Sequence, residues 1–79
     1  MGRPLAIITG GTKGIGAAIS FDLANTHDLA LIYLSDEGNA EKVLSTLNKK
    51  FADGIFRAYK ADIQNHEEIK VTYGKIKKD

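Results

Sequence analysis

The 79-residue sequence predicts a three-layer α/β/α fold built on a parallel sheet. Short apolar runs alternate with longer amphipathic segments, and the connections between them are short. A glycine-rich turn joins the first apolar run directly to the first helical segment. Right-handed crossovers between successive strands place the three strands in the order 3-2-1, with helices on both faces of the sheet.

The first strand is expected at residues 5–9, which are almost entirely apolar. The first helix follows from residue 14 or 15 to residue 25, with Ile15, Ile19 and Leu23 at four-residue spacing. The second strand, residues 29–34, is apolar on both faces, as is typical of a parallel sheet covered by helices on two sides.

A polar turn at residues 35–38 leads to a second helix, for which Asn39 is the predicted N-cap. Its apolar stripe has helical spacing and consists of Ala40, Val43, Leu44, Leu47 and Phe51. Asp53-Gly54 ends this helix, and residues 55–61 alternate in the manner of a third strand.

Asn65, followed three residues later by Glu68, has the form of a capping box at the start of a third helix. Ile69, Tyr73 and Ile76 are expected on the apolar side of that helix. Strand 5–9 would then lie at an apolar sheet edge without a partner, which favours aggregation or swapped strand pairing.

Composition argues against several classes of function. Eleven Lys and Arg against ten Asp and Glu give a net charge of +1, so no nucleic-acid or membrane partner is expected. The absence of cysteine excludes disulfides and thiolate metal sites. The longest apolar stretch is well short of the roughly 20 residues of a membrane span. Because the first strand begins almost at once, no signal peptide is expected and the predicted location is cytoplasmic.

Three glycines in the turn after the first strand suit a phosphate-binding loop. Gly10 lets the chain leave the strand in a conformation that a Cβ would strain. Gly14 lets the backbone approach a diphosphate, and Gly16 lets the helix pack closely on the sheet. The amides at the start of the helix then face the anion. The alternative is a glycine-rich turn that only tightens the corner between strand and helix.

Other phosphate loops fit the spacing poorly. A Walker loop needs Gly-Lys-Ser/Thr at its end, but Ala17 follows Gly16. The Gly-x-Gly-x-x-Gly fingerprint is absent as well, because the spacing here is Gly-x-x-x-Gly-x-Gly.

The segment Thr9-Gly10-Gly11-Thr12-Lys13-Gly14-Ile15-Gly16 resembles the cofactor loop of the short-chain dehydrogenase/reductase family. Asp62-Ile63 resembles the family's pair in which the Asp contacts the adenine amino group; a simple turn cap is the other role for Asp62. The Tyr33-Leu34-Ser35 strand end resembles the 3-oxoacyl-[acyl-carrier-protein] reductase subgroup. The resemblance implies that residues 1–79 are the N-terminal (βα)3 portion of a Rossmann-type dinucleotide-binding domain, truncated after the third helix.

The implied cofactor is NADP(H), with NAD(H) as the less favoured alternative. Leu34 stands where NAD-preferring members carry an acid, and the neutral Ser35 follows it. Lys13 resembles the basic residue of NADP(H)-preferring members, whereas Asp36 or Glu37 near the ribose would favour NAD(H). The predicted cofactor-binding residues are Gly10, Thr12, Lys13, Gly14, Ile15, Gly16, Ser35, Asp62 and Ile63.

No catalytic or metal-binding residue is predicted within the chain. Tyr73 and Lys77 match the family's Tyr-x-x-x-Lys spacing, but their position favours core packing of Tyr73. The resemblance implies hydride transfer involving a small-molecule carbonyl substrate, catalytic residues beyond Asp79 and a homo-oligomeric parent protein. Three hypotheses follow: the N-terminal piece of an NADP(H)-dependent carbonyl reductase, a free-standing nucleotide-binding or regulatory module, and a folding unit that binds nothing stably.

Overall fold

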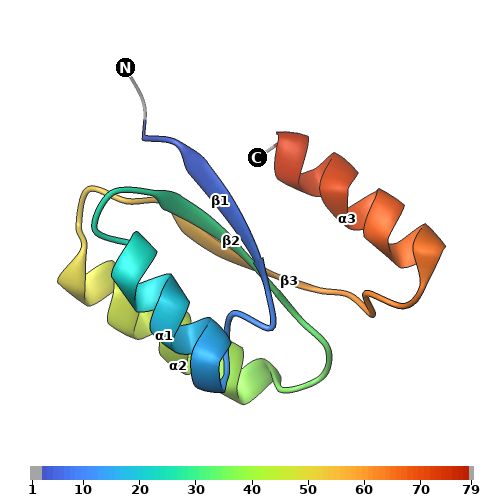
Figure 1. Ribbon diagram of the computed structural model, residues 1–79, viewed down its shortest axis with the longest axis horizontal. Coiled ribbons are helices and arrows are strands. Elements are labelled where there is room, and N and C mark those ends of the chain that lie inside the picture. The colour runs from blue at the N-terminus through green and yellow to red at the C-terminus, as the bar shows by residue number, and fades with distance from the viewer. Residues whose placement is uncertain (1–2, 79) are drawn as a thin grey trace.

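The computed structural model describes residues 3–78, which form three successive strand–helix units (Figure 1). In chain order the elements are β1 (Leu5–Thr9), α1 (Gly14–Leu23), β2 (Asp28–Tyr33), α2 (Glu37–Lys50), β3 (Phe56–Lys60) and α3 (His66–Lys78). All six elements were expected from the sequence, and β1 has the predicted bounds.

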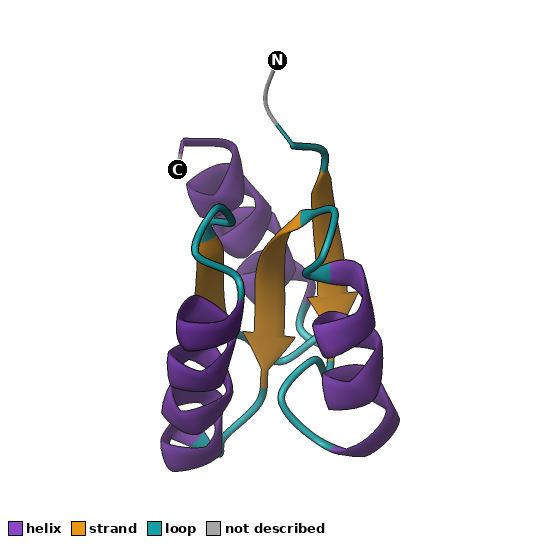
Figure 2. Cartoon of the chain, turned by 90° about the vertical axis from the view of Figure 1, so that its left-hand side faces the viewer, coloured by secondary structure: helices purple, strands orange, loops and turns teal. Residues whose placement is uncertain are grey.

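The three strands form one parallel sheet in the order β1-β2-β3, which confirms the predicted order. Leu5 is paired with Asp28 at one end of β1 and Thr9 with Ile32 at the other, while Leu29 of β2 is paired with Phe56. Helices α1 and α2 cover one face of the sheet and α3 lies on the opposite face (Figures 1 and 2). The fold is therefore the three-layer Rossmann-type arrangement that the sequence predicts.

The apolar core is divided by the sheet into two clusters. The cluster beneath α1 and α2 consists of Ala24, Leu29, Leu31, Val43, Leu47 and Phe56. The smaller cluster on the other face consists of Ala30, Ile32, Ala61 and Ile76. Because adjacent residues of β2 belong to opposite clusters, this strand is buried on both faces, as its continuous apolar sequence predicts.

The orientation of α1 differs from the one expected. Of the predicted stripe, Ile15 is 81% exposed and Ile19 is 45% exposed, whereas Leu23 is partly buried and packs against the core. The buried side of the helix carries the small residue Ser20, and Ala24 directly after the helix is also buried. Ser20 leaves room for the start of the helix to approach the end of β1, while Phe21 and Leu23 pack against the core further along.

Two details of the other helices also differ from expectation. Helix α2 begins at Glu37 and its N-cap is Asp36, whose side chain accepts a hydrogen bond from the Asn39 amide, so the assignment of Asn39 as N-cap was wrong. On α3, Tyr73 is 46% exposed, whereas Thr72 and Ile76 are buried. The inward stripe therefore contains Ile69, Thr72 and Ile76, and Tyr73 lies one residue beyond it.

The predicted cap of α3 is confirmed. Asn65 Oδ1 accepts hydrogen bonds from the amides of Glu67 (3.0 Å) and Glu68 (3.2 Å). The Glu68 carboxylate does not return to the Asn65 amide; it accepts a bond from the Asp62 amide at 3.2 Å. The Glu68 side chain therefore reaches three residues further back than in a capping box and holds the start of the β3–α3 turn.

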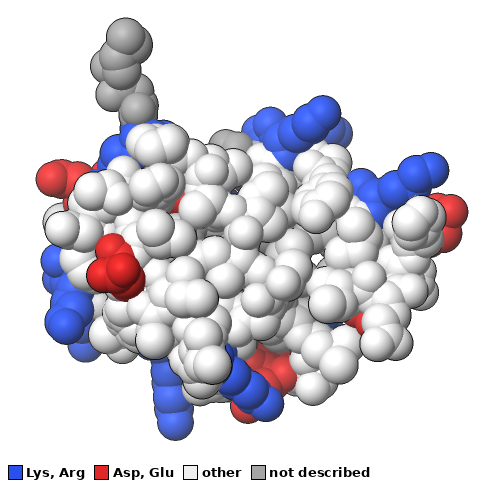
Figure 3. Space-filling view, in the orientation of Figure 1, with Lys and Arg blue, Asp and Glu red and all other residues white. Residues whose placement is uncertain are grey.

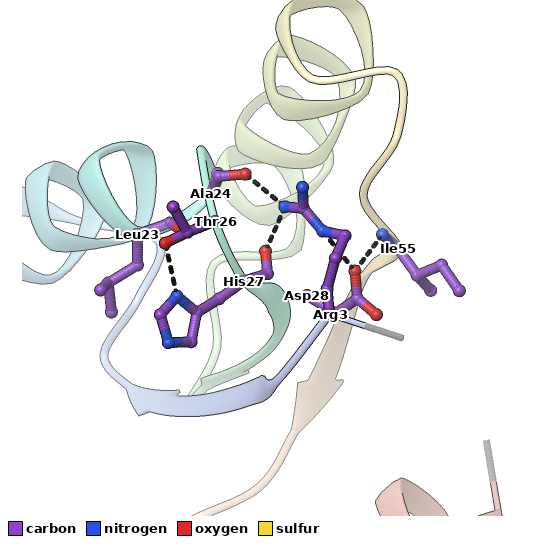
Figure 4. A network of polar contacts seen from close by, with 7 residues as sticks. All are labelled: Arg3, Leu23, Ala24, Thr26, His27, Asp28 and Ile55. Atoms are coloured by element: carbon purple, nitrogen blue, oxygen red, sulfur yellow. Dashed lines mark hydrogen bonds and ion pairs between the residues drawn. The ribbon is translucent and has the colours of Figure 1, made fainter. Parts of the chain in front are cut away.

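Arg3 and Asp28 connect the segments that meet at the amino ends of the strands (Figure 4). Arg3 Nε lies 3.0 Å from Asp28 Oδ1, and both side chains are mostly buried. Arg3 Nη2 donates to the carbonyl oxygens of Ala24 and His27, beyond the end of α1. Asp28 Oδ1 also accepts from the Ile55 amide at 2.9 Å, immediately before β3. One ion pair therefore joins the chain before β1 to α1, β2 and β3.

Replacing Arg3 with Ala should lower the free energy of unfolding by about 1.5–3 kcal/mol, because it removes charge-assisted bonds and leaves Asp28 without its cation. Arg3→Lys should recover only part of this loss, since an ammonium cannot reproduce the fork of the guanidinium. Urea denaturation measures both values. Arg57→Ala, which removes an exposed arginine of β3, is the control and should change stability little. Equal effects at the two positions would contradict this account.

The two edges of the sheet differ in charge. Within residues 3–78, β1 is paired only with β2, and its exposed side chains include Leu5 (51%) and Ile7 (45%). The β3 edge carries Arg57 and Lys60, whereas β1 carries no charged residue. Figure 3 shows an uncharged surface over β1, with charged side chains mainly at the periphery. The unpaired apolar edge predicted from the sequence is therefore present.

The 79-residue chain should self-associate through β1, and Ile7→Lys should shift it toward monomer, because charge on an edge strand opposes pairing with another strand. Sedimentation velocity over a range of concentrations measures the change. Val71→Lys, at an exposed apolar position on α3, introduces the same charge away from this edge and should leave association unchanged. A wild-type chain that remains monomeric at high concentration would refute the prediction.

Candidate functional site

The glycine-rich segment forms the loop between β1 and α1, at the carboxyl ends of the strands. Gly10 has φ 68° and Gly14 has φ 49°, and both values lie in the left-handed region that favours glycine. This confirms the prediction that the chain leaves the strand at Gly10 in a conformation that a Cβ would strain. A Cβ at Gly14 would meet nothing within 4 Å. The loop is therefore open at the point where its backbone was predicted to approach a diphosphate.

The closest approach in the loop is between Gly16 of α1 and Gly10. A Cβ placed on Gly16 would lie 2.0 Å from the Gly10 carbonyl oxygen. The predicted close packing at Gly16 is confirmed, but its partner is the loop backbone directly after β1. This contact places the first turn of α1 against the end of β1 without an intervening side chain.

The amino end of α1 presents amide groups that its own hydrogen-bond ladder does not use. The first backbone bond of the helix runs from the Ala17 amide to the Lys13 carbonyl oxygen at 3.1 Å. The amides of Gly14, Ile15 and Gly16 precede it, and Lys13 at the N-cap makes no side-chain cap bond. With the partial positive charge of the helix terminus, these three amides suit an anion such as a diphosphate.

Gly16→Ala should destabilise the chain by at least about 1–3 kcal/mol, since the new Cβ collides with backbone rather than with a movable side chain. The affinity for any dinucleotide should fall with it. Gly38→Ala is a matched control within α2, where a Cβ would make an ordinary contact at 3.9 Å with Asp36. Thermal unfolding distinguishes the two variants, and an unaffected Gly16→Ala protein would contradict the role of this contact.

A hollow of about 210 Å³ lies between the loop and the end of β2. Its lining residues are Gly10, Thr12, Lys13, Tyr33, Leu34, Ser35 and Asp36. Lys13 Nζ lies 3.5 Å from Asp36 Oδ2, and both side chains are largely exposed. The hydrogen bond from the Asn39 amide, together with the Lys13 charge, lowers the pKa of Asp36. A cation, an anion and a neutral hydroxyl therefore surround one small space.

Of the two acids after β2, only Asp36 lines this hollow. Glu37 Oε1 instead lies 3.5 Å from Lys60 Nζ, at the end of β3. Asp36 is thus the acidic group that a ligand between Lys13 and Ser35 would meet. Asp36 is accordingly relevant to the choice between the two nicotinamide dinucleotides.

A second hollow, of about 370 Å³, lies at the ends of β2 and β3 and shares Gly10, Tyr33 and Leu34 with the first. Asp62 and Ile63 line it. Asp62 Oδ1 accepts a bond from the Gln64 amide at 2.9 Å, so the carboxylate caps the turn before α3. The turn-cap role of Asp62 is therefore present, and the half-buried carboxylate also borders the hollow, where it could accept a bond from an adenine amino group.

Two residues that hold the loop were missed in the sequence. Ser20 is completely buried, and its hydroxyl lies 2.8 Å from the Gly16 carbonyl oxygen and 3.1 Å from that of Gly11. Asn39 Nδ2 donates to the Thr12 carbonyl oxygen across 27 positions of sequence. A serine inside an otherwise apolar helix turn was an available signal for Ser20. No local pattern indicated the partner of Asn39.

The fold and the site together define a nucleotide-binding unit of the Rossmann type. The hollows lie outside the carboxyl ends of the strands, beside the glycine loop, where open α/β sheets bind their ligands. The sequence model of the short chain dehydrogenase family matches residues 4–79, so the chain belongs to that family. No helix within residues 3–78 has the length and apolar character needed to cross a membrane.

Two relatives share substantial identity with the chain. The short chain dehydrogenase penD of Penicillium thymicola is 41% identical over 63 residues, which cover 76% of this chain and 22% of the relative. The 3-oxoacyl-[acyl-carrier-protein] reductase FabG of Buchnera aphidicola subsp. Baizongia pistaciae (strain Bp) is 33% identical over 70 residues, covering 89% of this chain and 27% of that protein. The chain thus spans about a quarter of the length of these relatives.

Solved structures show the same fold. The NADPH-dependent 3-quinuclidinone reductase of Rhodotorula rubra is 32% identical, with a TM-score of 0.88, and the match covers 100% of this chain and 29% of that enzyme. L-sorbose reductase of Gluconobacter frateurii, solved with NADPH and L-sorbose, is 20% identical with a TM-score of 0.88 and coverage of 100% and 30%. At that lower identity the likeness concerns the fold alone.

Proposed function

We propose that this chain forms the adenosine and diphosphate half of the cofactor site of an NADP(H)-dependent carbonyl reductase, one resembling 3-oxoacyl-thioester reductases. The observation that carries the proposal is the geometry of the glycine loop. It combines two left-handed glycines, a helix start pressed against the end of β1 and three amides ahead of the hydrogen-bond ladder of the helix. In this proposal residues 1–79 are the N-terminal (βα)3 portion of the dinucleotide-binding domain.

Each predicted residue has a role in this proposal. The amides of Gly14, Ile15 and Gly16 hold the diphosphate, while Gly10 and Thr12 shape the loop beneath it. Lys13 and Ser35 flank the ribose, and Asp62 and Ile63 border the adenine. The residues present fit the dinucleotide because a Cβ at Gly14 would meet nothing within 4 Å, which leaves room for the diphosphate, and because the two hollows adjoin one another at Gly10, Tyr33 and Leu34.

The chemistry of the proposed reaction belongs to the bound cofactor, whose nicotinamide ring transfers a hydride to or from a carbonyl substrate. The contribution of this chain is binding and orientation: helix-terminal amides neutralise the diphosphate and fix the adenosine end. Tyr73 and Lys77 have the family's catalytic spacing but lie on α3, where Tyr73 is 46% exposed and lines neither hollow. We assign no proton-transfer role to this pair.

The preference for NADP(H) rests on the groups around the first hollow. Lys13 provides a cation, Ser35 a neutral hydroxyl, and the position of Leu34 offers no carboxylate to the ribose. Asp36 opposes this preference, because its carboxylate already pairs with Lys13 and would repel a 2′-phosphate. The names of the NADPH-dependent 3-quinuclidinone reductase and the 3-oxoacyl-[acyl-carrier-protein] reductase support both the cofactor and the substrate class.

Binding of NADPH to the wild-type chain, followed by isothermal titration calorimetry, is the direct test. Lys13→Gln should weaken NADPH binding about 10- to 100-fold and NADH binding much less, since only NADPH carries the 2′-phosphate. Asp36→Asn should raise NADPH affinity up to about fivefold by removing a like charge. Lys49→Gln, at an exposed position of α2, is the control. Equal losses for both nucleotides in Lys13→Gln would contradict the assignment of Lys13 to the 2′-phosphate.

A second candidate function is a nucleotide-binding or regulatory module that performs no chemistry. The observation that favours it is the lining of the two hollows: within residues 3–78 these side chains supply binding groups, and Tyr33 and Lys13, which both line the first hollow, do not have the Tyr-x-x-x-Lys spacing. The codons that follow Asp79 distinguish the candidates. A downstream Tyr-x-x-x-Lys supports the reductase, and a stop codon directly after Asp79 supports the module.

A cytoplasmic location and a homo-oligomeric parent protein remain part of the proposal. Fractionation of cells that express the gene tests the location. Size-exclusion chromatography of the complete gene product tests the oligomeric state.

A further inference from the structure

We propose that Asn39, in the first turn of α2, is a positioning residue that holds the glycine loop in its ligand-binding shape through the Thr12 carbonyl oxygen. The inference rests on the proposed function, because it treats this loop as the diphosphate site. It assigns to Asn39 a role different from the helix cap that its sequence position suggested.

Asn39 is well placed to restrain the loop. Its Nδ2 donates to the carbonyl oxygen of Thr12, a residue that is only 3% exposed. Its own amide is bonded to Asp36 Oδ1 at 3.0 Å, which orients the first turn of α2. Asp36 in turn pairs with Lys13. The start of α2 therefore contacts two consecutive residues of the loop.

A second helix also holds the loop. Ser20 of α1 lies with its hydroxyl 3.1 Å from the Gly11 carbonyl oxygen. The carbonyls of Gly11 and Thr12 are thus held by side chains of two different helices. Ser20 belongs to the helix that the loop leads into, so its contact is local. Asn39 is the member of this pair that connects the loop to a separate element.

Peptide geometry lets these carbonyl contacts fix the amides of Thr12 and Lys13, which come directly before the three amides assigned to the diphosphate. Because each peptide unit is planar and trans, fixing the Gly11 carbonyl fixes the direction of the Thr12 N–H. Fixing the Thr12 carbonyl likewise fixes the N–H of Lys13. These peptide units lie between Gly10 and Gly14, whose wide conformational freedom would otherwise let the loop sample many shapes. A loop that is already ordered loses less entropy when a ligand binds.

The position of Asn39 also links two parts of the proposed site. Ser35 and Asp36, which come four and three residues before Asn39, line the hollow assigned to the ribose. Its side chain reaches the loop assigned to the diphosphate. This hydrogen bond therefore ties the segment that lines the ribose hollow to the loop assigned to the diphosphate.

The test compares Asn39→Leu, which removes the donor but keeps a similar side-chain size, with Asn39→Gln, which keeps the amide. Asn48→Leu is the matched control, at an exposed position of the same helix. The affinities for NADPH and NADH and the hydrogen exchange of residues 10–16 are measured for each variant. Asn39→Leu should lose about 2- to 10-fold in affinity for both nucleotides and exchange faster in the loop, while β2 exchange stays as in the control.

Asn39→Gln should recover part of both losses, which a purely space-filling role would not allow. Unchanged loop exchange in Asn39→Leu would overturn the proposal, as would unchanged affinity for both nucleotides. A wild-type chain that binds neither nucleotide would refute the proposed function instead. In that case exchange in the ligand-free variants still decides whether Asn39 positions the loop.

Discussion

The contact between Gly16 and the Gly10 carbonyl oxygen is the constraint on which the rest of the structure depends. No side chain separates the first turn of α1 from the end of β1, since even a methyl group there would overlap the backbone. The amides of this turn are therefore brought beside the carboxyl end of the sheet. The same contact leaves the buried Ser20 on the inner side of the first turns of α1 and Ile15 and Ile19 on the exposed side. The close contact of Gly16 with Gly10 therefore accounts both for the position of the helix-terminal amides and for the exposure of Ile15 and Ile19.

The two ends of the sheet have different tasks. At the amino ends of the strands, Arg3 and Asp28 form hydrogen bonds that join the segments before β1, after α1 and before β3. At the carboxyl ends, the hollows and the helix-terminal amides leave polar groups available. Because the strands are fixed at their amino ends, their carboxyl ends keep a defined arrangement. The residues that face the hollows need not provide this order by their own packing.

Sequence patterns were sufficient where local spacing determines structure. The bounds of β1, the stripe of α2 and the Asn65 cap each follow from residues near one another in the chain, and each was predicted. The orientation of α1 could not be predicted in this way, because spacing of apolar residues does not reveal a backbone contact that excludes them. Local preference also could not separate Asp36 from Asn39 as the cap, since both residue types cap helices well. The bond from Asn39 to Thr12 spans 27 positions, so only the folded chain reveals it.

Because the two edges of the sheet differ in charge, they are not equally able to pair with a further strand. Lysine and arginine on β3 discourage any further strand on that side, whereas β1 offers backbone groups flanked by aliphatic side chains. A further strand, from this chain or from another, is therefore expected to pair with β1 and not with β3. A strand paired with β1 would also lie directly next to the glycine loop. The residues that follow it would then border the binding crevice.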